Sequence, residues 1–283
     1  NSSLGIANRG GERAMLEIAC GLENDFRITR YSGGQAIGIS TIRLPTVQRD
    51  HVLARIPEWI ASTRLRRIVR RLHLTAIDIE RMTFSLSAVR HLMGFDLVIT
   101  QGDFWTTTVC RLVRTLRKIP FITVSQGMIQ SGREALRSRP DALVVVNLDV
   151  EGELQKEFPD CRIKFIWHGV DLETFKPAPF HNPFHLERPV FLCVAACEPR
   201  KRIDLAIRAI ARLEKGSLLV LGDGEVQSEV DALGNTLLGA RRFHRTVAPL
   251  SKIPKYYAAC DAFTMPSENE TFGLVYLEAM ACN

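Results

Sequence analysis

Short apolar runs along the chain alternate with longer segments in which apolar residues recur every three or four positions. The apolar runs predict buried strands at 95–100, 120–124, 142–146, 163–166, 190–195, 217–221 and 262–265, and weaker ones at 26–31, 37–40 and 241–244. Helical spacing predicts helices at 10–22, 52–72, 104–118, 201–207 and 253–261, one that ends near 157, and a last one from Phe272. Strands that alternate with helices in this way favour an α/β fold with parallel sheets.

The alternation is interrupted once, by a polar segment that contains Pro177, Pro179 and Pro183. Such a composition is typical of a connection between domains. We therefore predict a first domain over 1–170, a linker over 171–188 and a second domain over 189–283. With 283 residues, of which 46% are hydrophobic, the chain is long enough for two cores.

Composition excludes several classes of protein. Charged residues make up 24% of the chain, which is not a disordered composition, and the net charge of +6 is too modest to suggest a nucleic-acid partner. Seven cysteines without close pairing favour reduced thiols in a cytoplasmic protein. No apolar run is long enough to cross a bilayer. Because the chain stops directly after the last predicted helix, we expect an incomplete carboxyl-terminal domain.

The predicted helix at 52–72 combines an apolar stripe with five arginines between residues 64 and 71. Two interpretations of this helix stay open. It lies on an anionic membrane surface, which a basic amphipathic helix can do, or it is a surface helix whose arginines are simply solvated.

The strand, turn and helix at 262–282 carry the candidate chemistry. Thr271 is placed to cap the helix, and the free N–H groups of the first turn form an anion site above the sheet. Glu270 lies on the turn and Glu278 two helical turns later. Phosphates on the N–H groups and sugar hydroxyls on the two acids describe a nucleotide sugar.

This segment resembles a known enzyme family. Glu270 and Glu278, with seven residues between them, match the E-x7-E motif of retaining GT-B glycosyltransferases, and the sequence SENETFGLVYLEAMAC is similar to the signature of glycosyltransferase family 4. The similarity is nearly continuous from Trp167 to Cys282, whereas earlier residues match in outline. The resemblance implies the GT-B fold, in which two Rossmann-like domains enclose a cleft.

The resemblance also implies roles for individual residues. Glu270 would contact the donor sugar, Glu278 would bind the ribose, and Lys201, helped by Arg200, would neutralise the departing phosphate. Further donor contacts are expected at Asn269, Thr271, Phe272, Gly273, Leu274, Gly10, Gly11 and Gly222. The sequence shows no Asp-x-Asp motif, and the resemblance implies neither a metal ion nor a cofactor besides the nucleotide-sugar donor.

The chain departs from the family pattern at three places. Ala195-Ala196 replaces a usual Gly-Arg, which puts one of two cationic contacts in doubt. Ser125-Gln126-Gly127 follows the strand at 120–124, where the family often has a histidine, so we assign no base on the acceptor side. His168 stands where asparagine is common, and we interpret it as a histidine of the linker or the cleft edge.

The predicted function is therefore transfer of a sugar, with retention of configuration, from a nucleoside-diphosphate donor to a glycan or lipid-linked acceptor. The expected setting is the cytoplasm, with peripheral contact to an anionic membrane. Two alternatives stay open: a sugar-nucleotide epimerase or phosphorylase of the same fold, and a non-catalytic module that binds nucleotide sugars.

Overall fold

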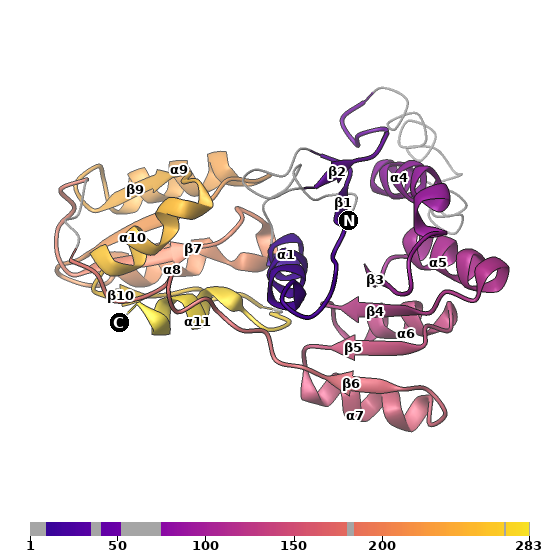
Figure 1. The fold of residues 1–283 in the computed structure, drawn as a ribbon. Helices are drawn as coiled ribbons and strands as arrows, with labels where there is room; N and C mark the ends of the chain where they lie inside the picture. The colour runs from indigo at the N-terminus through magenta and orange to yellow at the C-terminus, as the bar shows by residue number, and fades with distance from the viewer. Residues whose placement is uncertain (1–9, 35–40, 52–74, 180–183, 269, 283) are drawn as a thin grey trace. The chain divides into compact units, whose positions relative to one another are not determined.

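The computed structural model describes residues 10–34, 41–51, 75–179, 184–268 and 270–282 (Figure 1). The chain divides into two compact units, with the boundary in sequence between Trp167 and His168. Each unit has its own four-stranded sheet of parallel strands, as the alternation of strands and helices predicts. The predicted helix at 52–72 and the predicted strand at 37–40 lie outside the described residues.

The amino-terminal unit is built on a sheet with the strand order β3-β4-β5-β6. Its strands are β3 (Val98–Gln101), β4 (Phe121–Ser125), β5 (Ala142–Val145) and β6 (Ile163–Phe165), and the helices that follow the first three are α5 (Phe104–Arg117), α6 (Ile129–Arg137) and α7 (Leu148–Glu157). Phe121, Leu143 and Leu154 are fully buried in this unit. The strand predicted from residue 95 begins at Val98, where the backbone first pairs with Phe121.

Four elements precede this sheet: α1 (Gly10–Leu22), β1 (Tyr31–Ser32), β2 (Ile42–Arg43) and α4 (Ala76–Leu92). The predicted helix at 10–22 is confirmed, but the strand predicted at 26–31 is only two residues long and pairs with β2 alone. Thr75 and Asp78 form a capping box at the start of α4. On the same helix the buried carboxylate of Glu80 accepts bonds from the Arg49 guanidinium at 2.7 and 2.9 Å, which ties the segment 41–51 to α4.

The carboxyl-terminal unit has the strand order β10-β7-β8-β9. Its strands are β7 (Val190–Val194), β8 (Ser217–Leu221), β9 (Phe243–Thr246) and β10 (Ala262–Phe263), and its α-helices are α8 (Ile203–Ala211), α9 (Gln227–Leu237), α10 (Ile253–Ala259) and α11 (Leu274–Ala281). All five residues of β8 are buried, which is why its apolar run is continuous.

Two elements in this unit, α8 and β9, begin two residues later than the sequence predicts. The helix expected from Lys201 begins at Ile203, because Pro199–Lys201 form a 3₁₀ turn and Arg202 has a left-handed backbone conformation. The strand expected at 241–244 starts at Phe243. Both changes shift a predicted element by two residues and keep its type.

Residues of the predicted linker contribute to the core of the carboxyl-terminal unit. Phe175 is 1% exposed and Leu186 is 6% exposed, and both pack with Val190, Leu192 and Leu219. None of the helices among the described residues has both the length and the apolar character needed to cross a membrane.

Candidate functional site

The loops that follow β7 and β10 lie together at one end of the carboxyl-terminal sheet. The two strands are direct neighbours, with Ala262 opposite Phe191, so their carboxyl ends deliver both loops to the same place. The backbone N–H of Glu268 donates to the carbonyl of Arg200 at 3.0 Å, which holds one loop against the other. In parallel α/β sheets this edge is where ligands bind.

Lys201 and Glu270 form an ion pair across these loops. The Lys201 Nζ donates to Glu270 Oε2, with the lysine side chain 11% exposed and the glutamate side chain 26% exposed. The two residues are 69 positions apart in sequence, and the structure brings them together as one charged unit. A partly dehydrated pair of this kind keeps both charges in place without ligand.

The helix α11 begins differently from the sequence prediction. Thr271 is not its cap: Gly273 occupies that position with a left-handed φ of 77° and no capping side chain. A Cβ atom at Gly273 would lie 2.5 Å from a ring carbon of Tyr276, so both the backbone and the space require glycine. Tyr276 is held in turn by its hydroxyl, which donates to the Met265 carbonyl at 2.7 Å. Burial, and secondarily the charge of Glu270, raises the pKa of Tyr276.

Glu278 lies inside the carboxyl-terminal unit. It is 3% exposed, and its Oε2 accepts a hydrogen bond from the Tyr257 hydroxyl at 2.8 Å. Tyr257 is on α10 and is itself 6% exposed. The sequence showed Glu278 as one acid on a helix and gave no sign of its buried tyrosine partner.

His168 belongs to the carboxyl-terminal unit and touches the same loop. Its ring meets the Phe272 ring edge to face, with 5.2 Å between the ring centroids. Burial lowers the pKa of His168. The sequence assigned this histidine to a linker or a cleft edge, and contact with Phe272 could not be seen from it.

Comparison with known proteins gives the family. The sequence model of the family described as "Glycosyl transferases group 1" matches residues 175–283, a range that contains Lys201, Glu270 and Glu278. The match is to this part of the chain, which is also where the sequence resembles glycosyltransferase family 4.

The curated proteins that this chain resembles are named as sugar transferases. It is 27% identical over 303 residues to the GDP-mannose-dependent alpha-(1-6)-phosphatidylinositol monomannoside mannosyltransferase of Mycolicibacterium smegmatis, with 97% of this chain and 75% of that protein covered. It is 28% identical over 213 residues to the D-inositol 3-phosphate glycosyltransferase of Kineococcus radiotolerans, with 64% and 48% covered. The chain thus spans about half the length of that second relative.

Solved structures show the same fold. Anabaena Alr3699/HepE in complex with UDP and glucose matches with a TM-score of 0.72 at 16% identity, over 100% of this chain and 77% of that one. The apo form of the lipopolysaccharide outer core galactosyltransferase WaaB matches with a TM-score of 0.56 at 16% identity, over 99% and 76%. These likenesses confirm the predicted GT-B fold. Together with the curated relatives, the family match supports the glycosyltransferase prediction rather than its two alternatives.

The arginines beside Lys201 in this glycosyltransferase are engaged elsewhere. Arg200 pairs with Glu198 at 2.8 Å, and half of its side chain is exposed. Arg202, which the sequence analysis did not single out, pairs with Glu268 and with Asp204. Lys201 is therefore the residue of this cluster that pairs with Glu270. The role of Arg200 in neutralising the departing phosphate stays a prediction.

The remaining predicted donor contacts are spread over both units of the glycosyltransferase. Gly222 follows β8, and its carbonyl accepts a bond from Arg245 at 3.0 Å. Gly10 and Gly11 begin α1 in the amino-terminal unit. Thr271 and Leu274 flank Phe272 and Gly273, and Asn269 lies outside the described residues. Their contact with a donor stays a prediction.

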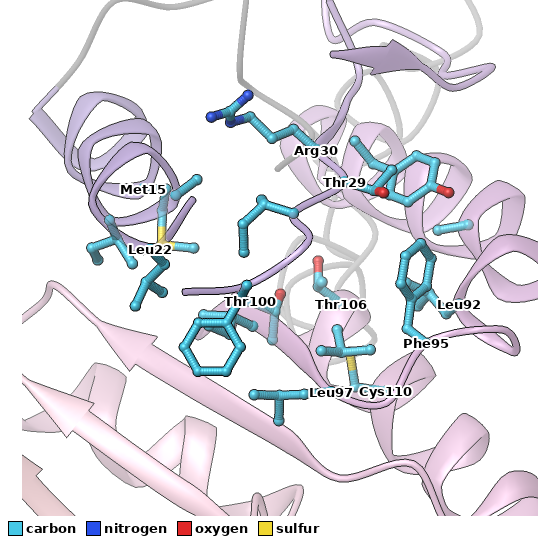
Figure 2. A pocket seen from close by; sticks show the side chains of 18 of the residues that line it. Met15, Leu22, Thr29, Arg30, Leu92, Phe95, Leu97, Thr100, Thr106 and Cys110 are labelled. Atoms are coloured by element: carbon cyan, nitrogen blue, oxygen red, sulfur yellow. The ribbon is translucent and has the colours of Figure 1, made fainter. Parts of the chain in front are cut away.

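The amino-terminal unit also contains a cavity of about 360 Å³ (Figure 2). It is bordered by α1, the segment 26–31, α4, the segment 95–100 and α5. Figure 2 shows Met15, Leu22, Phe95, Leu97 and Cys110 among its lining residues, and most of the lining is apolar. Because a nucleotide sugar needs polar partners for its phosphates and hydroxyls, we do not assign this cavity to the donor.

Proposed function

We propose that this chain is a metal-independent, retaining glycosyltransferase that uses a nucleoside-diphosphate sugar. The observation that carries the proposal is the Lys201–Glu270 pair beside the start of α11. A lysine, a carboxylate and a helix N-terminus at one sheet edge supply one partner for each part of such a donor. The group 1 family match over the same residues supports this reading.

The diphosphate is the part of the donor that needs positive charge. The first turn of α11 offers backbone N–H groups, and its dipole favours an anion. Lys201, which is paired with Glu270, adds its ammonium group next to that turn. As the bond between sugar and phosphate breaks, negative charge grows on the leaving phosphate, and a fixed cation lowers the barrier most when it is already in position. These two sources of positive potential are our reason to propose that no metal ion takes part.

The two carboxylates have separate tasks in this proposal. Glu270, partly exposed on its loop, accepts hydrogen bonds from hydroxyls of the donor sugar, and its partner Lys201 orients it. Glu278, buried and held by Tyr257, binds the ribose hydroxyls at the inner end of the site. Each acid therefore binds a different ring of the same donor: Glu270 the transferred sugar and Glu278 the ribose.

The acceptor is proposed from the names of the relatives, and the cellular setting is proposed from the sequence. One relative is named for phosphatidylinositol monomannoside and others for D-inositol 3-phosphate, so we propose a hydroxyl of a glycan or lipid-linked acceptor. We also propose a cytoplasmic protein that contacts an anionic membrane through the basic segment 52–72. Vesicles with anionic lipid should bind the chain at low salt and release it at high salt. Absence of binding at low salt would contradict the membrane part alone.

A transfer assay tests the proposed reaction. GDP-mannose, UDP-glucose, UDP-N-acetylglucosamine and ADP-glucose are offered in EDTA with inositol 3-phosphate, phosphatidylinositol vesicles or water as acceptor. We expect one donor to be used, with the anomeric configuration retained in the product. The substitution Glu270→Ala should reduce kcat more than it raises KM, whereas Glu214→Ala, an exposed acid of the same unit, should change neither. An unchanged kcat in Glu270→Ala would remove the role we give this acid.

A further inference from the structure

Two glutamines from neighbouring strands meet at the carboxyl edge of the amino-terminal sheet. Gln101 is the last residue of β3, and Gln126 directly follows β4. The strands are parallel, with Gln101 opposite Val124, so both side chains emerge at the same edge. The Gln101 Nε2 donates to Gln126 Oε1 at 3.3 Å. This edge is the place in a parallel α/β sheet where ligands bind.

The other half of the Gln126 amide has no acceptor among the residues that the structure describes. Its Nε2 is buried, and within the described part of the chain it makes no hydrogen bond. A buried donor left without a partner is unfavourable, so such groups are rare unless a ligand completes them. The Gln126 residue as a whole is partly exposed at the sheet edge, although its Nε2 atom is covered.

The start of α1 packs closely against the side-chain amides of Gln101 and Gln126. A Cβ atom at Gly11 would lie 2.6 Å from Gln126 Oε1 and 2.9 Å from Gln101 Nε2. A side chain at this position would therefore displace both amides. The backbone of α1 can come this close because residue 11 is glycine, so three separate elements converge on the Gln126 amide.

The turn after Gln126 is also fixed. The Ser125 hydroxyl, which is 1% exposed, donates to the Ser131 hydroxyl at 3.1 Å. Gly127 packs directly on Ser131, because a Cβ atom there would lie 2.6 Å from the Ser131 Cβ. The amide is thus held by its turn as well as by Gln101 and Gly11, and it is oriented before any ligand arrives.

We propose that Gln126 binds and positions the acceptor, as the contact for two adjacent hydroxyl groups of a cyclic polyol such as a sugar or cyclitol ring. The Gln126 Nε2 donates to one hydroxyl, and the second lone pair of Oε1 accepts from its neighbour. A neutral amide cannot take up a proton at neutral pH, so Gln126 positions the acceptor and is not a base. This inference rests on the proposed function, because it assigns the acceptor of the same reaction.

The first test substitutes the amide. In Gln126→Ala we expect the acceptor KM to rise about tenfold or more, the equivalent of one lost hydrogen-bonded contact. Hydrolysis of the donor by water should persist, so that the ratio of transfer to hydrolysis falls. Binding of the nucleoside diphosphate should not change. The control is Gln130→Ala, an exposed glutamine at the start of α6.

The second test keeps Gln126 in the sequence and displaces its side-chain amide by a substitution at a neighbouring residue. Gly11→Ala should shift the amides and raise the acceptor KM, although alanine favours the helix itself. Gly21→Ala, in the same helix with open space around its Cβ, should leave the acceptor KM unchanged. Equal kinetics in the two variants would contradict the convergence on Gln126.

The third test uses small ligands as competitors. Myo-inositol and methyl α-mannoside carry adjacent ring hydroxyls, and cyclohexanol carries one. We expect the first two to inhibit transfer in the original chain and to lose this effect in Gln126→Ala, with no effect of cyclohexanol in either. If Gln126→Ala keeps the original KM and inhibition while donor hydrolysis is normal, the inference is wrong and the proposed function stands. If the original chain neither binds nor hydrolyses any donor, the proposed function itself fails.

Discussion

Gly273→Ala is the substitution whose cost the structure defines most closely. Gly273 has a φ of 77°, and its Cβ would lie 2.5 Å from Tyr276 Cδ2 and 2.8 Å from Cε2. Gly239 offers a matched control in the same unit, because it has a φ of 68° with nothing within 4 Å of its Cβ. The difference between the two alanine variants isolates the contact with Tyr276 from the strain of the left-handed backbone.

The two costs can be estimated separately. A left-handed alanine costs about 1–2 kcal/mol, which is the whole expected loss for Gly239→Ala. Gly273→Ala adds the cost of an overpacked contact, about 1–3 kcal/mol, because the Tyr276 ring cannot move without breaking its bond to Met265. We therefore expect Gly273→Ala to lower the free energy of unfolding by about 2–5 kcal/mol.

Urea unfolding followed by circular dichroism measures both variants. Because the chain has two units, hydrogen exchange of the α8 and α11 amides is needed to report the carboxyl-terminal unit itself. In the double variant with Tyr276→Ala, the extra cost of Gly273→Ala should vanish. A loss in Gly273→Ala no greater than that in Gly239→Ala would refute the reasoning about the start of α11.

Three further predictions follow from single contacts. Tyr257→Phe should lower the free energy of unfolding by about 1.5–3 kcal/mol, because the buried Glu278 loses its hydrogen bond, and an unchanged urea midpoint would contradict this. Burial lowers the pKa of His168, so the contribution of this histidine to stability is complete above its unfolded pKa near 6.5 and declines as the pH falls below that value. His168→Phe should therefore flatten the dependence of the urea midpoint on pH below about 6.5. An unaltered slope would contradict this prediction. Gly152→Ala, within α7 and with open space around its Cβ, should raise the free energy of unfolding by about 0.5–1 kcal/mol and with it the urea midpoint. A lower urea midpoint would argue against an unstrained helix there.

Much of the fold could be predicted because its strands are buried on both faces. The run at 217–221 forms β8 with identical bounds, and the run at 190–195 forms β7 with one residue less. The pattern failed where pairing depends on distant residues. The segment 26–31 has strand-like residues, yet among the described residues Tyr31 is the one member of this segment that pairs with another strand.

The candidate site could be predicted in its residue types and not in its contacts. Lys201 and Glu270 were expected at one site, and the structure joins them because β7 and β10 are neighbours. The predicted helix start was wrong because Gly273 has a left-handed backbone conformation, so that α11 begins at Leu274. Burial of Glu278 could not be foreseen either, since an acid on a helix is usually solvated and Tyr257 comes from another helix.

The binding of a nucleoside diphosphate without metal is the central claim, and an equilibrium titration in EDTA tests it most directly. UDP, GDP, dTDP and ADP are titrated into the original chain, Lys201→Ala and the control Lys215→Ala, which changes an exposed lysine of the same unit. We predict that one of them binds, and that at a hundred times its Kd it stabilises the chain by about 2.7 kcal/mol. Lys201→Ala should weaken that binding about tenfold or more, and Lys215→Ala should not. Binding of none of the four to the folded chain, or equal binding by Lys201→Ala, would contradict the account.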